Sequence, residues 1–192
     1  MEDKGLLISK FYDSTIDIKK EIQNIEMEYH IVLPNQYKDF LMRYNGGYTP
    51  KTNFRVKKVS SDLRGFFGVG NAKLNLWDIE LTDWVKRNLF PIACDSFGNY
   101  ILLGLGDDEG KVFFADHEKG YASKFLAQDV KDFIGCCKSE VIGDEFTQSI
   151  EEREAYLIAK GRGDIITDGL RKMWQCEIDK YKDIMQEEVF LD

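Results

Sequence analysis

The chain has 192 residues, of which 43% are hydrophobic and 13% aromatic, and a formal net charge of −8. This composition excludes a disordered tail and is sufficient for one domain with a sizeable core and a short extension. The apolar run near the N-terminus, Leu6–Ile8, is far too short for a signal-peptide core or a membrane-spanning helix. We therefore expect a cytoplasmic protein without a membrane segment.

The negative charge is concentrated towards the C-terminus. Residues 1–139 hold 20 acidic and 19 basic side chains, whereas residues 140–192 hold 14 acidic and 7 basic ones. An acidic surface disfavours direct nucleic-acid binding, because affinity for phosphates depends on Lys and Arg. It suits a partner protein with a basic surface, although such charge also serves solubility alone.

The cysteines are scattered along the chain and include no C-x-x-C pair, which argues against a zinc or redox motif. Cys94 ends the apolar run Pro91–Cys94, which predicts a small buried thiol. We expect neither a disulfide framework nor a cofactor.

Two helices are predicted near the N-terminus. Ile18, Ile22, Ile25 and Tyr29 are three or four residues apart, which is the spacing of an amphipathic helix. Pro34 fits the first position of a second helix that carries Tyr37, Phe40, Leu41 and Tyr44. Asn45-Gly46-Gly47 can adopt positive φ and should end it.

The middle of the chain reads as a sheet with one helix. Alternation predicts a strand over Phe54–Val59 and a loop or bulged edge over Ser60–Gly70, and helical spacing predicts a helix over Lys73–Lys86. Short polar turns separate three further segments, which predicts an antiparallel meander at the sheet centre. These segments are Phe90–Asp95, Tyr100–Leu105 and Lys111–Asp116.

The last third of the chain is predicted to be helical. One helix should cover Gln128–Lys138, and Ser149 with Glu152 has the spacing of a capping box that starts another helix, ending near Lys160. A final helix should begin near Asp168. The predicted class is therefore α+β, with a mainly antiparallel, curved sheet flanked by helices and a helical C-terminal extension. We expect residues 1–139 to form the α+β domain and residues 140–192 an acidic helical extension packed on it.

From about Ile22 to Cys137 the chain resembles the SUKH superfamily, which includes yeast cell-wall-assembly regulators and bacterial immunity proteins. The resemblance depends on the order and spacing of several short motifs, none specific alone. They are Leu33-Pro34, Tyr37 with Phe40-Leu41, Asn45-Gly46-Gly47, Phe90-Pro91-Ile92-Ala93, Asp95 with Gly98-Asn99, Asp116-His117-Glu118, and Ala127 to Phe133-Ile134.

The resemblance implies a binding role rather than an enzymatic one, and in bacteria an immunity protein that neutralises a cognate toxin, often a nuclease. An intracellular adaptor or regulator of the same fold is the alternative. A third hypothesis is a hydrolase that uses Asp95, Asp116 and His117. Asp116-His117-Glu118 gathers metal-ligand types, but consecutive strand residues alternate faces and would not converge on one ion.

Candidate partner contacts follow from charge and from aromatic residues. Asp107, Asp108 and Glu109 should form a solvated hairpin tip that meets a basic toxin surface, although a hairpin tip is polar in any case. If Lys73–Lys86 is one helix, its tryptophans share a face, and core packing is the alternative role for each. The further candidates are Trp77 and Trp84, Asp78, Glu80 and Asp83, and the C-terminal Glu187, Glu188 and Asp192.

Overall fold

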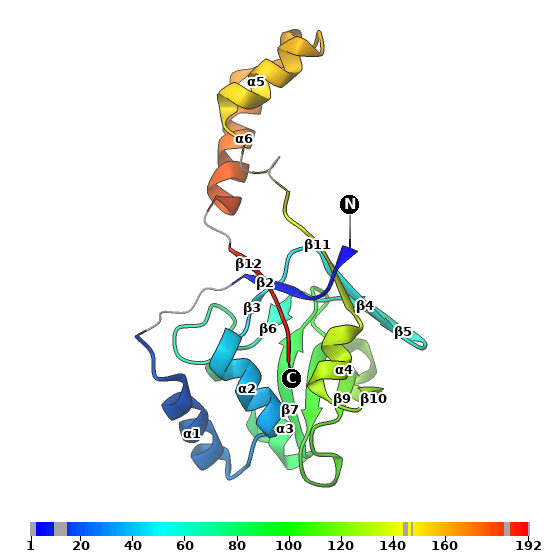
Figure 1. The fold of residues 1–192 in the computed structure, drawn as a ribbon. Coiled ribbons are helices and arrows are strands. Elements are labelled where there is room, and N and C mark those ends of the chain that lie inside the picture. The colour runs from blue at the N-terminus through cyan, green and yellow to red at the C-terminus, as the bar shows by residue number, and fades with distance from the viewer. Residues whose placement is uncertain (1–2, 10–14, 144–145, 147, 183–184, 192) are drawn as a thin grey trace. The chain divides into compact units, whose positions relative to one another are not determined.

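A computed structural model describes residues 3–9, 15–143, 146, 148–182 and 185–191 (Figure 1). The chain divides into two compact units, which are Met1–Val141 with Gln186–Asp192, and Ile142–Met185. The C-terminal segment from Gln186 belongs to the first unit.

The helices of the first unit are α1 (Ile18–Tyr29), α2 (Asn35–Tyr44), α3 (Thr82–Lys86) and α4 (Val130–Gly135), with short 3-10 turns η1 (Leu76–Asp78), η2 (Gly106–Asp108) and η3 (His117–Lys119). Its strands are β1 (Asp3–Lys4), β2 (Leu7–Ser9), β3 (Gly47–Tyr48), β4 (Thr52–Val56), β5 (Val59–Asp62), β6 (Gly65–Phe66), β7 (Leu89–Cys94), β8 (Tyr100–Gly104), β9 (Val112–Asp116), β10 (Ala122–Ala127), β11 (Cys137–Glu140) and β12 (Gln186–Glu188). The second unit contains α5 (Ile150–Ala159), η5 (Gly163–Ile165) and α6 (Asp168–Tyr181).

The strands form two sheets whose neighbouring strands pair antiparallel. The larger has eight strands in the order β10-β9-β8-β7-β6-β3-β2-β12, and the smaller has four in the order β1-β11-β4-β5. The predicted meander is confirmed as β7, β8 and β9, which pair in sequence. The α+β class with C-terminal helices is therefore confirmed.

The two N-terminal helices form where their apolar spacing predicts. Asp17 caps α1 by accepting from the Lys20 amide, and the helix buries Ile18, Ile22 and Ile25. Pro34 lies one position before the predicted one, as the N-cap of α2. Asn45 ends α2 at a φ of 51°.

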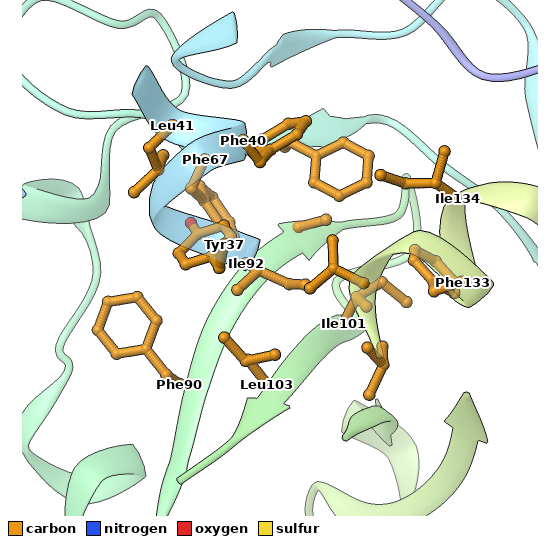
Figure 2. Packing of buried hydrophobic residues seen from close by; sticks show 14 of the residues in the cluster. Tyr37, Phe40, Leu41, Phe67, Phe90, Ile92, Ile101, Leu103, Phe133 and Ile134 are labelled. Atoms are coloured by element: carbon orange, nitrogen blue, oxygen red, sulfur yellow. The ribbon is translucent and has the colours of Figure 1, made fainter. Parts of the chain in front are cut away.

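The core lies between the helices and the larger sheet. In Figure 2 the side chains of Tyr37 and Phe40 on α2 and of Phe133 on α4 point towards the strands that carry Ile92 and Ile101. All five side chains are fully buried. This packing anchors β7 and β8, and with them the turn that joins these strands.

Three predicted elements differ in the structure. The segment Phe54–Val59 is not one strand, because Lys57 adopts a φ of 52° and turns the chain from β4 into β5. The prediction of a single helix over Lys73–Lys86 is wrong. Instead, the Asn75 side chain accepts from the Trp77 amide and caps the one-turn η1, and α3 begins separately at Thr82. The helix predicted over Gln128–Lys138 covers only Val130–Gly135, since Cys137 already pairs with Phe54 in the small sheet.

The C-terminal region is helical except at its end. Helix α5 begins with the predicted capping box, in which the Glu152 amide donates to Ser149 Oγ at 3.2 Å and the Ser149 amide to Glu152 Oε2 at 2.8 Å. The prediction of a wholly helical extension is wrong for Gln186–Glu188, which form β12 and pair with β2. Backbone pairing to an existing edge strand outweighs helix propensity there. The predicted packing of the remaining extension on the first domain stays a prediction.

None of the helices within the described ranges is long and apolar enough to cross a membrane.

Candidate protein-binding surface

A buried carboxylate organises the turn between β7 and β8. Asp95 is 2% exposed, and its Oδ1 accepts from the amides of Phe97 and Asn99 at 2.9 and 2.8 Å. Its Oδ2 accepts from Ser61 Oγ at 2.7 Å and from Asn99 Nδ2 at 2.6 Å. A carboxylate that accepts this many bonds from one short turn holds the turn in a single conformation.

Asn99 extends the network to the next hairpin. Its Oδ1 accepts from the His117 amide at 2.9 Å and lies 2.8 Å from His117 Nδ1. The Ser96 amide donates to Asp62 Oδ1 at 3.1 Å, which ties the turn to the small sheet. The turn is therefore joined by hydrogen bonds to both β5 and the end of β9.

This rigid turn presents an aromatic side chain to solvent. The Phe97 side chain is 65% exposed, although its own amide donates to Asp95 and the Ser96 amide before it donates to Asp62. Gly98 follows it at a φ of 90°, a conformation that favours glycine. An exposed large aromatic on a preorganised turn is typical of a protein-binding anchor.

Phe97 stands between three shallow grooves. The first, of about 680 Å³, runs along the small sheet and includes Arg55 and Lys138. The second, of about 510 Å³, includes Arg64 and Lys73. The third, also about 510 Å³, lies towards His117. We define the Phe97 surface as Phe97 with these three grooves.

The predicted acidic tip is confirmed as the connection between β8 and β9, and its carboxylates are exposed. Asp108 pairs with Lys111 at 2.7 Å, so part of its charge is neutralised locally. The tip follows the C-terminal end of β8, whereas Phe97 precedes the strand's N-terminal end. The structure therefore does not bring the acidic tip and Phe97 together.

The acidic residues of the Lys73–Lys86 segment are exposed but serve partly local roles. Glu80 Oε1 accepts from the Thr82 amide at 3.1 Å at the start of α3, and hydrogen bonds from Thr82 lower the pKa of that carboxyl. Asp83 pairs with Lys86 at 3.1 Å. Asp78 is exposed beside the second groove of the Phe97 surface.

The two tryptophans do not share a face. Trp84 is buried, with its ring centroid 5.6 Å from that of Tyr100 and 5.3 Å from that of Tyr121, so it belongs to a core cluster. Trp77 is 37% exposed, and its Nε1 donates to Glu21 Oε2 at 3.4 Å. Of the pair, Trp77 offers the more accessible surface.

Glu187 and Glu188 are half-buried on β12, opposite Ile8 and Leu7 of β2. They therefore lie on a sheet edge rather than on the predicted helix. Asp192 lies outside the described residues.

The residues of the hydrolase hypothesis have structural roles. Asp95 is engaged by the turn, and Lys119 Nζ donates to Asp116 Oδ2 at 2.5 Å, which lowers the pKa of that carboxyl. No group of three or more His, Cys, Asp or Glu side chains within the described ranges could hold a metal ion. Burial raises the pKa of the Cys94 thiol to about 11, and the four cysteines are free.

The sequence of Ser96–Asn99 predicts a turn but does not by itself indicate Phe97 as a binding residue. A signal was present, since a large aromatic between polar turn residues and glycine has no obvious place in a core. Its exposure depends on how Asp95 and Asn99 fold the turn, and this needs the structure.

The comparisons with known proteins agree with the fold. The SUKH_6 family model, described as SMI1-KNR4 cell-wall, matches residues 19–134. The chain belongs to this family. The SPbeta prophage-derived uncharacterized protein YokK of Bacillus subtilis (strain 168) is 29% identical over 144 residues, covering 62% of this chain and 74% of that protein. No solved structure gave a significant match. The SUKH_6 match ends before the second unit, whose role it does not address.

Proposed function

We propose that this SUKH-family protein is an immunity protein, which binds and neutralises a cognate bacterial toxin in the cytoplasm without catalysing a reaction. The observation that carries the proposal is Phe97, an exposed aromatic held on a turn by a buried carboxylate. Membership of the family and similarity to a prophage-derived protein support it.

Preorganisation gives Phe97 its value as an anchor. Because the Asp95 bonds fix the turn before binding, little conformational entropy is lost when a partner closes over the ring. Interface aromatics that bury fully on binding commonly contribute about 2 kcal/mol or more, which corresponds to roughly thirtyfold in affinity.

The experiment co-expresses the full chain with the product of a neighbouring candidate toxin gene and scores survival and co-purification. Phe97→Ala should lose protection and lower affinity by at least about tenfold. Phe190→Ala is the matched control, since Phe190 is also largely exposed. Equal protection by both variants would contradict the role of Phe97. Failure of the wild type to protect against any neighbouring product would favour the adaptor role.

The acidic residues stay proposed contacts for a basic toxin surface, such as that of a nuclease. Reversing Asp107, Asp108 and Glu109 together should slow association, because rim charges act mainly on the association rate. Reversing Asp78, Glu80 and Asp83, and separately Glu187 and Glu188, extends the test. If every reversal leaves toxin binding unchanged, acidic steering is wrong.

A further inference from the structure

We propose that the first groove of the Phe97 surface takes an acidic segment of the partner protein that carries an apolar side chain. This inference depends on the proposed function and assigns the chemistry of the contact at this surface. It differs from the basic partner surface expected opposite Asp107, Asp108 and Glu109, because that acidic tip follows β8 whereas Phe97 precedes it.

The groove is lined by two outward-facing cations from neighbouring strands. Arg55 on β4 and Lys138 on β11 are both exposed and line the same groove as Phe97. Their positions follow from strand alternation, since the adjacent Phe54 and Cys137 are buried on the opposite face. Within the described part of the chain, neither cation forms an ion pair.

The acidic groups near the groove offset only part of this positive charge. Asp62 also lines the groove and accepts from the Ser96 amide through Oδ1, so its one negative charge faces the two positive charges of Arg55 and Lys138. Glu140 pairs with Lys51 at 2.6 Å. The β4–β5 turn adds Lys57 and Lys58, both exposed. A chain with a net charge of −8 thus carries a cationic face beside its exposed aromatic.

Charge and shape together favour an acidic protein segment. Carboxylates of the segment would meet Arg55 and Lys138, while its apolar side chain would pack against the Phe97 ring. Nucleic acid fits less well, because phosphate-backbone affinity grows with the number of cations engaged, and the groove offers only two in an acidic protein.

The test selects a displayed random-peptide library on the immobilised full chain. Recovered peptides are then labelled, and their affinity is measured by fluorescence anisotropy at low and high salt. We expect recovered peptides to be enriched in Asp and Glu beside an apolar residue. Arg55→Glu/Lys138→Glu should weaken their binding by at least about tenfold, and added salt should weaken wild-type binding.

The matched control is Lys19→Glu/Lys20→Glu, which changes net charge equally on the exposed side of α1. It should retain wild-type affinity, and circular dichroism of each variant confirms that it is folded. Basic or neutral peptides, or equal weakening by both double variants, would overturn the inference. An oligo-dT strand that binds more tightly than the peptides and is lost with Arg55→Glu/Lys138→Glu would replace it with a nucleic-acid site.

The two proposals can fail separately. If toxin capture needs Phe97 but tolerates Arg55→Glu/Lys138→Glu, the proposed function stands and the acidic-segment inference is wrong. If acidic peptides need Arg55 and Lys138 while no toxin is captured, the surface chemistry stands and the toxin partner is wrong.

Discussion

The two compact units are stabilised in different ways. In the first unit, a large cluster of buried apolar side chains joins both sheets to α1, α2 and α4. In the second unit, Arg153 and Trp174 are the only residues that are buried among those described. One unit therefore depends on apolar area removed from water, and the other depends on a few specific polar contacts.

Arg153 is the centre of the second unit. Its guanidinium lies 5.9 Å from the Trp174 ring centroid, pairs with Glu177 at 2.6 Å, and donates to the Gln148 carbonyl at 3.1 Å. Such a site combines stacking, charge and hydrogen bonding in one side chain. A helical hairpin without a large core therefore concentrates its stability in few residues. A single substitution should destabilise one unit and leave the stability of the other unchanged.

The largest effect is expected in the first unit. Phe133→Ala should lower its free energy of unfolding by about 3–5 kcal/mol, because the ring is fully buried and packs 5.3 Å from the Phe54 ring centroid. Denaturant unfolding followed by tryptophan fluorescence and circular dichroism measures this. Phe190→Ala, largely exposed, is the control and should cost under about 1 kcal/mol.

The next largest effect is expected in the second unit. Arg153→Met should destabilise the second unit by about 1.5–3 kcal/mol, since hydrogen bonds to charged groups contribute on this scale. Amide hydrogen exchange should show faster exchange in α5 and α6, with β7 and β8 unchanged. Arg171→Met is the control, because its pairs with Glu154 and Asp168 are more exposed and solvent-screened and should contribute less to stability. Equal destabilisation by both variants would contradict a central role for Arg153.

A smaller effect tests how the returning chain end is held in the first unit. Tyr44 Oη donates to the Phe190 carbonyl at 3.1 Å and accepts from the Phe190 amide at 2.9 Å. Tyr44→Phe should therefore cost about 1 kcal/mol.

Tyr37→Phe is the matched variant, because the Tyr37 hydroxyl is buried with no hydrogen-bond partner among the described residues. Removing a buried hydroxyl that makes no bond should leave stability unchanged or raise it. Thermal melts of the two variants measure these changes in stability. A larger loss for Tyr37→Phe than for Tyr44→Phe would show that the Tyr37 hydroxyl has a partner in solution.

An effect that is absent at neutral pH and appears only in alkaline solution separates the buried and exposed thiols. Burial raises the pKa of the Cys94 thiol from its ordinary value of 9.0 to about 11, so the folded state retains a proton that the unfolded state loses. Stability should then fall as pH rises between about 9 and 11, and Cys94→Ala should make that fall shallower by up to one proton. Urea unfolding at several pH values measures it. Cys176→Ala, which changes an exposed thiol, should leave the slope unaltered.

The sequence predicted the elements whose signals are local. The spacing of Ile18, Ile22 and Ile25 set the face of α1, and Ser149 with Glu152 marked the start of α5. Strands β7, β8 and β9 were predicted because short polar turns bound their apolar runs. The resemblance to the SUKH superfamily, taken from motif order, is confirmed by the match over residues 19–134.

Other features depend on contacts between distant residues, which no local pattern encodes. The helical spacing of Lys73–Lys86 was real, but the Asn75 cap and the burial of Trp84 among Tyr100 and Tyr121 broke the segment in two. Gln186–Glu188 became a strand only because β2 offered an edge about 180 residues earlier in the chain.

In the candidate site, too, local sequence predicts one part and tertiary contacts decide the other. The sequence determined that Ser96–Asn99 is a turn, since its residues have turn chemistry. Only the tertiary structure decided that Ser61 of β5 and Asp95 lock this turn and leave the Phe97 ring in solvent beside Arg55 and Lys138. Binding surfaces form where strands distant in sequence meet, so their charge and exposure are properties of the packed chain.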